Sequence, residues 1–364
     1  MFYFSLIVIA IIITSITLTA NTDSYLINAA VTTATTSSNQ SIQHNQQVIS
    51  NTVKGDDASN STSNYDNTFI SNKTNNNAGL FQIGNIGAKK ITVGDIQIAY
   101  KSFGNGLPII LISGSGNVMD VWPSYFLQDL AKNHKVVIFD NRGVGNTTSG
   151  IKPFSIVQFA IDTAGLMDAL KIQKADILGF SMASFIAQQL TLMYPEKVNH
   201  LILYGASCGG QEGITQNATV VKAISDFVNN RTQNPNAFLS VTFPLKWMKE
   251  HPDYLKVFPK TSEIVPSSTL KKQFDIVESW ISKNWSGVCN QLSDITQPSL
   301  IITGTEDVAV PATNSLILVQ KIPDAWLVQI KTAGHGLMYQ YPEKFTNIVK
   351  SFLEVTGNSI KIIN

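Results

Sequence analysis

The sequence has few of the residues on which metal, redox and nucleic-acid chemistry usually depend. It contains only two cysteines, Cys208 and Cys289, and they match no zinc-binding or thiol-redox spacing. Its five histidines include no pair at ligand spacing with a third candidate ligand, so we expect no metal site. Charged residues make up 14% of the chain and the formal net charge is +1, which gives no electrostatic attraction for nucleic acid. We therefore expect no nucleic-acid partner, and chemistry carried by ordinary side chains.

The N-terminus carries an uncharged apolar segment at residues 4–20. This segment is short for a membrane-spanning helix, which needs ~20 residues, and long enough for the central region of a signal peptide. No Lys or Arg precedes it, and Leu18 is a poor match for the small residue expected two positions before a cleavage site at Ala20. We expect residues 1–20 to be a signal peptide, with a retained N-terminal membrane anchor as the alternative. Both interpretations predict an exported protein, secreted or anchored to the outer face of the cell membrane.

Residues 21–80 have the composition of an unfolded spacer. The segment is rich in Asn, Ser and Thr, and it cannot bury enough apolar surface to offset the entropy lost on ordering it. We predict a disordered tether that leads to one folded domain at residues 81–364. The 44% of hydrophobic residues in the chain are sufficient for a sizeable core in that domain.

The folded part begins with a hairpin and continues as an alternation of strands and helices. Residues 91–100 alternate apolar and polar side chains around a Gly94-Asp95 turn. Apolar runs then predict buried strands, and amphipathic segments predict helices. The predicted strands are 107–113, 135–140, 175–180, 198–204, 299–303 and 325–331, and the predicted helices include 121–133, 155–170, 312–321 and 342–355. This order predicts an α/β fold with a doubly wound, mostly parallel sheet.

The alternation is interrupted between about residues 211 and 292. Helical patterns dominate there, at 220–229 and 270–283, and aromatic residues are concentrated in the same interval. We predict a helical cap inserted over the carboxyl edge of the sheet. Its aromatic residues fill the core of the cap or form the wall of a pocket: Phe227, Phe238, Phe243, Trp247, Tyr254, Phe258, Trp280 and Trp285. Cys208 and Cys289 bracket the cap; we expect two buried free thiols, although a disulfide is possible in an exported protein.

The stretch around Ser181 has the pattern of an exposed nucleophile. The strand 175–180 ends at Phe180, and apolar residues at helical spacing follow from Met182 onward. A serine at such a strand-to-helix turn projects from the edge of the sheet and lies beside the free N–H groups of a helix N-terminus. The small residues Gly179 and Ala183 allow the strand and the helix to approach closely. The alternative is an ordinary helix N-cap, which is a common position for serine.

Two more loops follow predicted strands at the same edge, and they contain an acid and a histidine. Residues 304–311 include Asp307, and residues 333–336 include His335 between two glycines. The order Ser, Asp, His is the one expected of a nucleophile-elbow hydrolase. With these motifs, and with the turn Asn141-Arg-Gly-Val-Gly145, residues 89–356 resemble the α/β-hydrolase fold superfamily, and specifically its cap-bearing serine esterase and lactonase-like branch.

The resemblance implies a catalytic triad and no cofactor. Ser181 would attack a carbonyl carbon, and His335 would take the proton of Ser181 and pass it to the leaving group. Asp307 would orient the imidazole of His335, with the neighbouring Glu306 as the weaker candidate for the acid. Asp140 and Arg142, in contrast, have the position of residues that brace a loop.

The resemblance also implies an oxyanion hole made of backbone N–H groups. One belongs to Met182 and the other to Ser115, in the glycine-rich loop that follows the strand 107–113. Two departures from the family pattern occur: Ala183 replaces the second glycine of the elbow, and Ser113 stands where a histidine is frequent. Gly114, Trp122 and Phe180 are the candidates for contact with the substrate, although Trp122 is also expected to pack under the first helix.

The favoured function is hydrolysis of a small carboxylic ester or lactone with an apolar part, through an acyl-enzyme. Cofactor-free haloperoxidase or perhydrolase activity and carbon–carbon bond hydrolysis use the same triad and remain alternatives. An aminopeptidase would need acidic residues in the cap to bind the substrate amine, and those present are scattered. A non-catalytic extracellular binding protein on the same fold is the alternative of a different class, although such proteins usually lack part of the triad.

Overall fold

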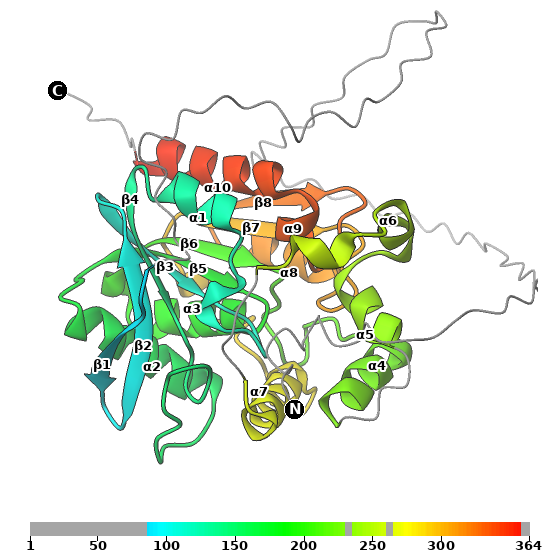
Figure 1. Cartoon of the computed structure of the whole chain (residues 1–364), viewed down its shortest axis with the longest axis horizontal. Helices are drawn as coiled ribbons and strands as arrows, with labels where there is room; N and C mark the ends of the chain where they lie inside the picture. The colour runs from blue at the N-terminus through cyan, green and yellow to red at the C-terminus, as the bar shows by residue number, and fades with distance from the viewer. Residues whose placement is uncertain (1–85, 230–234, 260–264, 358–364) are drawn as a thin grey trace, which may run out of the picture. The chain divides into compact units, whose positions relative to one another are not determined.

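The computed structural model describes residues 86–229, 235–259 and 265–357. The signal peptide or anchor predicted at 1–20 and the tether predicted at 21–80 lie outside these residues. The described part is organised on an eight-stranded sheet with the order β1-β2-β4-β3-β5-β6-β7-β8 (Figure 1). The strands are β1 (Lys89–Val93), β2 (Ile96–Phe103), β3 (Leu107–Ile112), β4 (His134–Phe139), β5 (Ala175–Phe180), β6 (Val198–Tyr204), β7 (Ser299–Gly304) and β8 (Ala325–Ile330).

The sheet is parallel except at one edge. β1 pairs with β2, and β2 with β4, in antiparallel register, and the strands from β4 to β8 are parallel. All six residues of β5 are buried, as expected of a central strand covered on both faces. Its side chains alternate between two cores: Ile177 faces one and Leu178 the other. The predicted α/β class with a doubly wound, mostly parallel sheet is confirmed.

Helices cover both faces of the sheet. α2 (Ile156–Ala169), α3 (Met182–Met193) and α8 (Thr313–Lys321) pack on one face (Figure 1). α1 (Ser124–Leu130) and α10 (Pro342–Gly357) pack on the other, where the rings of Phe126 and Phe345 meet edge to face at 5.0 Å. The short α9 (Leu337–Gln340) directly precedes α10. Burying each such aromatic side chain contributes about 1.5–3 kcal/mol to folding.

The helix predicted at 121–133 is shorter than expected. A single 3-10 turn occupies Met119–Val121, and α1 begins only at Ser124. Pro123 separates the two, because a proline disfavours helical geometry in the residue before it. The helix predicted at 155–170 agrees closely with α2, whose N-cap Ser155 accepts a hydrogen bond from the Gln158 N–H at 3.0 Å.

The chain leaves the sheet after β6 and returns to it at β7. The interval contains α4 (Ala218–Val228), α5 (Pro235–Thr242), α6 (Leu245–Glu250) and α7 (Ser267–Ile281), which gather beside one end of the sheet (Figure 1). α4 packs on α5 and α7. We refer to residues 211–292 as the cap. α5 and α6 were not predicted from the sequence.

The two cysteines form a disulfide, so the expectation of free thiols is wrong. Cys208 follows β6 and Cys289 follows α7, and their Cα atoms are 5.0 Å apart. The sequence conceals this proximity because 81 residues separate the two positions. The Val288 N–H donates to the Cys208 carbonyl at 3.0 Å, so the two connections between sheet and cap run side by side. The bond therefore closes the base of the cap.

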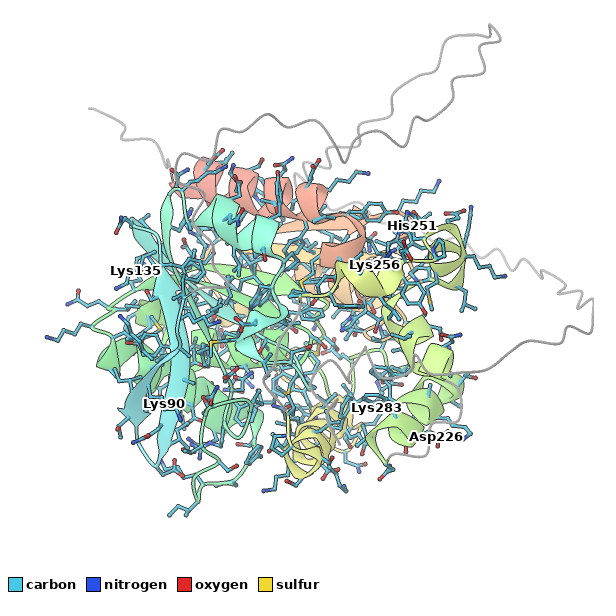
Figure 2. The ribbon with its side chains drawn as sticks, viewed as in Figure 1. Lys90, Lys135, Asp226, His251, Lys256 and Lys283 are labelled. Carbon is cyan, nitrogen blue, oxygen red and sulfur yellow. A yellow bond between two sulfur atoms is a disulfide. The ribbon has the colours of Figure 1, made fainter. Side chains whose placement is uncertain are left out.

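Charged side chains lie mainly at the surface, as Lys90, Lys256 and Lys283 illustrate (Figure 2). Lys283, at the end of α7, donates to the carbonyl of Gln211 at 2.9 Å and so adds a second link at the base of the cap. Within the described ranges, no helix has the length and the apolar character required to cross a bilayer.

Candidate active site

Ser181 occupies the sharp turn between β5 and α3. Its backbone angles are φ 57° and ψ −124°, a conformation that costs energy for any residue with a side chain. Backbone hydrogen bonds hold it there: the Ser181 N–H donates to the Tyr204 carbonyl at 2.9 Å, and the Ser184 N–H donates to the Ser181 carbonyl at 2.8 Å. Gly179 is required beside it, since a Cβ atom there would lie 2.2 Å from the Ala183 carbonyl oxygen. The strained turn presents the Ser181 hydroxyl to the cavity above the sheet.

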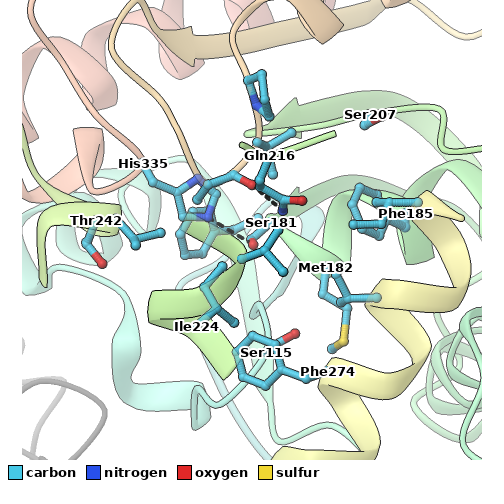
Figure 3. A pocket seen from close by; sticks show the side chains of 18 of the residues that line it. Ser115, Ser181, Met182, Phe185, Ser207, Gln216, Ile224, Thr242, Phe274 and His335 are labelled. Atoms are coloured by element: carbon cyan, nitrogen blue, oxygen red, sulfur yellow. Dashed lines mark hydrogen bonds between the residues drawn. The ribbon is translucent and has the colours of Figure 1, made fainter. Parts of the chain in front are cut away.

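The three predicted triad residues meet at the carboxyl edge of the sheet. The Nε2 atom of His335 lies 2.9 Å from the Oγ atom of Ser181 (Figure 3). The Nδ1 atom of His335 lies 2.8 Å from a carboxylate oxygen of Asp307. Ser181 follows β5, Asp307 follows β7 and His335 follows β8, so parallel strands bring the three loops together. The chain of contacts has the geometry of a nucleophile, a base and an orienting acid.

The surroundings of Asp307 distinguish it from its neighbour Glu306. The Asp307 side chain is fully buried, and its second oxygen accepts a hydrogen bond from the Val310 N–H at 2.9 Å. Glu306 is exposed to solvent. In the sequence, Glu306 was the weaker candidate for the acid. In the structure, Asp307, and not Glu306, contacts the imidazole of His335.

The loop that carries His335 is held from both sides. Tyr204, at the end of β6, donates a hydrogen bond from its hydroxyl to the His335 carbonyl. Burial raises the pKa of the Tyr204 phenol well above its usual value, so this donor stays protonated. On the other side, the Gly336 N–H donates to the carbonyl of Thr242 in the cap at 2.8 Å. The position of His335 therefore depends on contacts with both the sheet and the cap.

The loop after β3 lies directly against Ser181. A Cβ atom on Gly114 would be 3.0 Å from the Ser181 Cβ. The Asn117 N–H donates to the Gly114 carbonyl at 3.3 Å, and the Gly116 N–H donates to the side-chain oxygen of Gln273 at 2.8 Å. In the part of the chain that the structure describes, the Ser115 N–H finds no acceptor. It is thus free to bind a ligand oxygen beside Ser181.

The second predicted donor, the Met182 N–H, belongs to the first residue of α3. The first N–H groups of a helix have no partner within the helix, and its dipole favours negative charge at this end. Ser113, where the family pattern often has histidine, donates from its hydroxyl to the Asn117 carbonyl at 3.2 Å. Its own carbonyl accepts from the Asn141 side chain at 2.9 Å. These contacts order the loop without a histidine.

A cavity of about 170 Å³ opens over the Ser181 hydroxyl (Figure 3). Its wall is mostly apolar and comes from both the sheet edge and the cap. Phe180 and Met182 belong to its floor, and Ile224, Phe274 and Gln216 belong to its cap side. Glu278 is the one carboxylate of the described wall, and that wall includes no lysine or arginine. The cavity suits a small, largely apolar ligand.

Two of the residues expected to contact the substrate do not line this cavity. Trp122 is only 1% exposed and packs against Phe126 and Phe180 at centroid distances of 6.1 Å and 6.5 Å. It supports Phe180 from behind and is not part of the described wall. Gly114 is covered by Phe180 and Ser181. Phe180 and the loop residue Ser115 do line the cavity.

Most of the cap aromatic residues pack in the hydrophobic cores that the cap shares with the sheet, which was the first of the two expectations. Of the eight aromatic residues named from the sequence, only Phe238 lines the described cavity. Phe243 and Trp247 instead stack on each other at 4.9 Å, and Phe227 stacks on Phe238 at 3.9 Å. Four further residues of the cavity wall were not predicted, although their i, i+3, i+4, i+7 spacing on α7 identifies one helix face: Phe274, Val277, Glu278 and Ile281.

Asp140 and Arg142 have the bracing role that their position suggested. The Asp140 carboxylate accepts from the Met119 N–H at 2.7 Å. Arg142 is completely buried and binds both Asp95 and Asp162, with closest distances of 2.9 Å and 2.7 Å. Burial opposes its charge, but the hydrogen bonds to Asp162 and Asp95 outweigh burial and raise the Arg142 pKa above its usual value. Neither residue reaches the described cavity wall.

No group of three or more His, Cys, Asp or Glu side chains converges as a metal site within the described ranges.

Comparison with known proteins identifies the family of the fold. A family model of the alpha/beta hydrolase fold matches residues 108–342, which span the sheet, the elbow, the cap and the loop of His335. The chain belongs to the alpha/beta hydrolase fold family. This confirms the resemblance seen in the sequence motifs.

Similar members of the family carry names that refer to different reactions. The RutD protein of Azorhizobium caulinodans, named for carbamate hydrolysis, is 26% identical over 71% of this chain and 96% of its own length. The BpoC protein of Mycobacterium tuberculosis, named as a non-heme bromoperoxidase, is 28% identical over 71% of this chain and 99% of its own. The solved structure of Est816, described as an N-acyl homoserine lactone degrading enzyme, is 26% identical with a TM-score of 0.59, covering 72% of this chain and 100% of its own.

Proposed function

We propose that the protein is a serine hydrolase that cleaves a small ester or lactone with a neutral, apolar acyl group. The observation that carries the proposal is the hydrogen-bonded sequence Ser181–His335–Asp307 at the floor of an apolar cavity. The likeness to Est816 supports acyl transfer to water as the reaction class.

The reaction begins with attack of the Ser181 oxygen on the substrate carbonyl carbon. His335 takes the serine proton at Nε2, across the 2.9 Å contact. Asp307 stays ionised and stabilises the imidazolium that forms, through its 2.8 Å contact with Nδ1. The tetrahedral intermediate carries its negative charge on the former carbonyl oxygen, where the N–H groups of Met182 and Ser115 hold it. Each such donor is worth about 3–4 kcal/mol in the transition state.

The intermediate then collapses and the ester bond breaks. His335 returns its proton to the leaving alcohol oxygen, and the acyl group remains on Ser181. Water attacks the acyl-enzyme with His335 again acting as the base, and the carboxylic acid leaves as Ser181 regains its proton. For a lactone, the leaving alcohol is part of the same molecule, so one hydroxy acid is released.

The cavity favours neutral substrates over anionic ones. Glu278 contributes a negative charge, and the described wall offers no cation to bind a substrate carboxylate. This counts against a substrate that carries carboxylates. The volume of about 170 Å³ lies below the ~300–1,000 Å³ of pockets that hold drug-sized ligands, which favours short acyl chains.

The disulfide supports the expectation of an exported protein. Buried disulfides form and persist in oxidising compartments, and Cys208 and Cys289 are 1% and 2% exposed. We propose that the folded domain acts outside the cytoplasm, either released or tethered through residues 4–20.

The test is labelling with a fluorophosphonate probe, together with turnover of p-nitrophenyl acetate and butyrate. Wild-type protein is expected to label and to hydrolyse both esters, and Ser181→Ala to do neither while unfolding at the same temperature. Ser279→Ala is a control that removes an exposed hydroxyl on α7, outside the cavity wall, and it is expected to label. Folded wild-type protein that fails to label would contradict the hydrolase proposal and favour a binding protein. If the protein is labelled but hydrolyses neither esters nor lactones, its substrate would contain a different bond, such as a carbamate or a carbon–carbon bond.

A further inference from the structure

Gln273 connects the cap to the loop beside the nucleophile. It lies on α7 and its side chain is fully buried. Its Oε1 atom accepts a hydrogen bond from the Gly116 N–H at 2.8 Å, across 157 residues of sequence. The contact joins an element of the cap to the loop of the sheet that presents the Ser115 N–H.

The orientation of the Gln273 amide follows from its partner. A backbone N–H can only donate, so the side-chain oxygen has to face Gly116 and the NH₂ group has to point away. In the described part of the chain, this buried NH₂ group finds no acceptor. An unpaired buried donor lowers stability, and an apolar side chain of the same shape would avoid that cost. Packing alone does not account for an amide at this position.

The hydrogen bond fixes the conformation of the loop. Gly116 has φ +72°, so the chain turns sharply between Ser115 and Asn117. The Asn117 N–H is already engaged by the Gly114 carbonyl, and Gln273 engages the Gly116 N–H. With both groups held, the orientation of the intervening peptides is set, and the Ser115 N–H stays available to an oxyanion beside the Met182 N–H.

We propose that Gln273 is a positioning residue that sets the oxyanion hole through the Gly116 N–H. The inference rests on the proposed function, because it assigns the Ser115 N–H to the oxyanion. Phe274, the next residue of α7, lines the cavity. The helix that would contact the acyl group is therefore the same helix that orients the loop of Ser115. A correctly seated cap is then a condition for a complete oxyanion hole.

The experiment compares Gln273→Met, which keeps the length and removes the acceptor, with wild type. Gln273→Asn is a second variant, whose amide is too short to reach Gly116. Thr269→Val is the matched control, since it removes another buried polar group one turn earlier on α7. The measurements are kcat and KM for p-nitrophenyl butyrate, the unfolding temperature, and the inhibition constant of a trifluoromethyl ketone, whose adduct with serine carries an oxyanion.

The proposal predicts a kcat about 10–100-fold lower for both Gln273 variants, a KM within about twofold and a weaker trifluoromethyl ketone in the same proportion. Gln273→Met should unfold near the wild-type temperature, because it removes the unpaired NH₂ group of Gln273 but also takes the acceptor away from the Gly116 N–H. Thr269→Val should keep its kcat. Full activity in Gln273→Met, or an equal loss in Thr269→Val, overturns the inference while the hydrolase proposal stands. An unreactive wild type overturns the proposed function itself, which is a separate result.

Discussion

Gly205 lies against His335 so closely that any side chain would collide with the imidazole. A Cβ atom at position 205 would be 2.9 Å from the His335 Cε1 atom, and the backbone of Gly205 has φ +60°. The residue after β6 therefore has two independent reasons to be glycine. One is the turn itself, and the other is the space that the base of the triad needs.

We expect Gly205→Ala to displace His335 and to lower kcat by about 10²-fold, the usual cost of misplacing a reacting group by roughly 1 Å. Gly94→Ala is a suitable control, because Gly94, in the turn between β1 and β2, also has a positive φ, +54°, and a Cβ atom there would meet only the end of the Lys152 side chain, at 3.5 Å. Steady-state kinetics and thermal unfolding of both variants would check this. If both variants lost the same activity, backbone strain, and not a collision with His335, would explain the loss in Gly205→Ala.

The acid of the triad can be assigned by exchanging neighbouring residues. Asp307→Asn is expected to lower kcat by about 10³–10⁴-fold, because an amide cannot hold the imidazole in the required tautomer. Glu306→Gln should keep most of the activity, since Glu306 is exposed. The measurement is kcat for a p-nitrophenyl ester. A larger loss in Glu306→Gln than in Asp307→Asn would reverse the assignment.

Glu278 is expected to act against anionic substrates. Glu278→Lys replaces the carboxylate of the cavity wall by a cation and should raise the ratio of kcat/KM for a carboxylate-bearing ester over a neutral one by about tenfold. Asp275→Lys is the matched control on the same helix, where Asp275 pairs with Lys271 and does not line the cavity. The shift should weaken at high salt. A shift of the same size in Asp275→Lys would mean that overall charge, and not the cavity, sets the preference.

The disulfide should contribute measurably to stability. Replacing both Cys208 and Cys289 by alanine is expected to lower the free energy of unfolding by about 2–4 kcal/mol. Without the bond, the unfolded chain has a higher conformational entropy, because the loop between the two positions is no longer closed. Urea denaturation of the two proteins gives the difference, and a thiol titration of denatured, unreduced wild type should find no free thiol. Two titratable thiols in that sample would contradict the bond.

Acid stability is expected to depend on Asp95. Its hydrogen bonds with Arg142, and those it accepts from the Lys152 and Ile151 N–H groups, lower its pKa in the folded state despite the opposing effect of burial. In the unfolded chain this pKa is about 3.9. The contribution to stability is therefore present above about pH 4 and is lost as the pH falls below the unfolded value toward the folded one. Asp95→Asn should unfold more easily than wild type at pH 7, with a difference that shrinks in urea denaturation toward pH 2. A constant difference at all pH values would argue against this linkage.

The sheet and the triad could be predicted from the sequence because each rests on a local pattern. The runs at 175–180 and 198–204 coincide with β5 and β6, since buried parallel strands are continuously apolar. Ser181, Asp307 and His335 each follow such a run, and parallel topology alone brings the ends of the strands together. Ser181 was found from the strand-to-helix turn that follows residues 175–180, and its meeting with Asp307 and His335 from the order of the strands.

The cap was less predictable because its features depend on distant contacts. α6 has only six residues, Leu245–Glu250, too few to show a helical period. The pairing of Cys208 with Cys289 and the contact between Gln273 and Gly116 depend on how the cap folds back on the sheet, which no local pattern records. Trp122 had two expected positions, under the first helix or at the border of the pocket, and the structure shows the first, with Trp122 packed against Phe126 of α1.

The disulfide between Cys208 and Cys289 also determines what happens to the protein when a protease cleaves the cap. It joins the two points at which the cap begins and ends. A protease that cuts the cap once, anywhere between these residues, produces two fragments that remain one covalent molecule. The half with Ser181 and the half with Asp307 and His335 would stay attached, so a nicked protein would separate into its parts only after reduction.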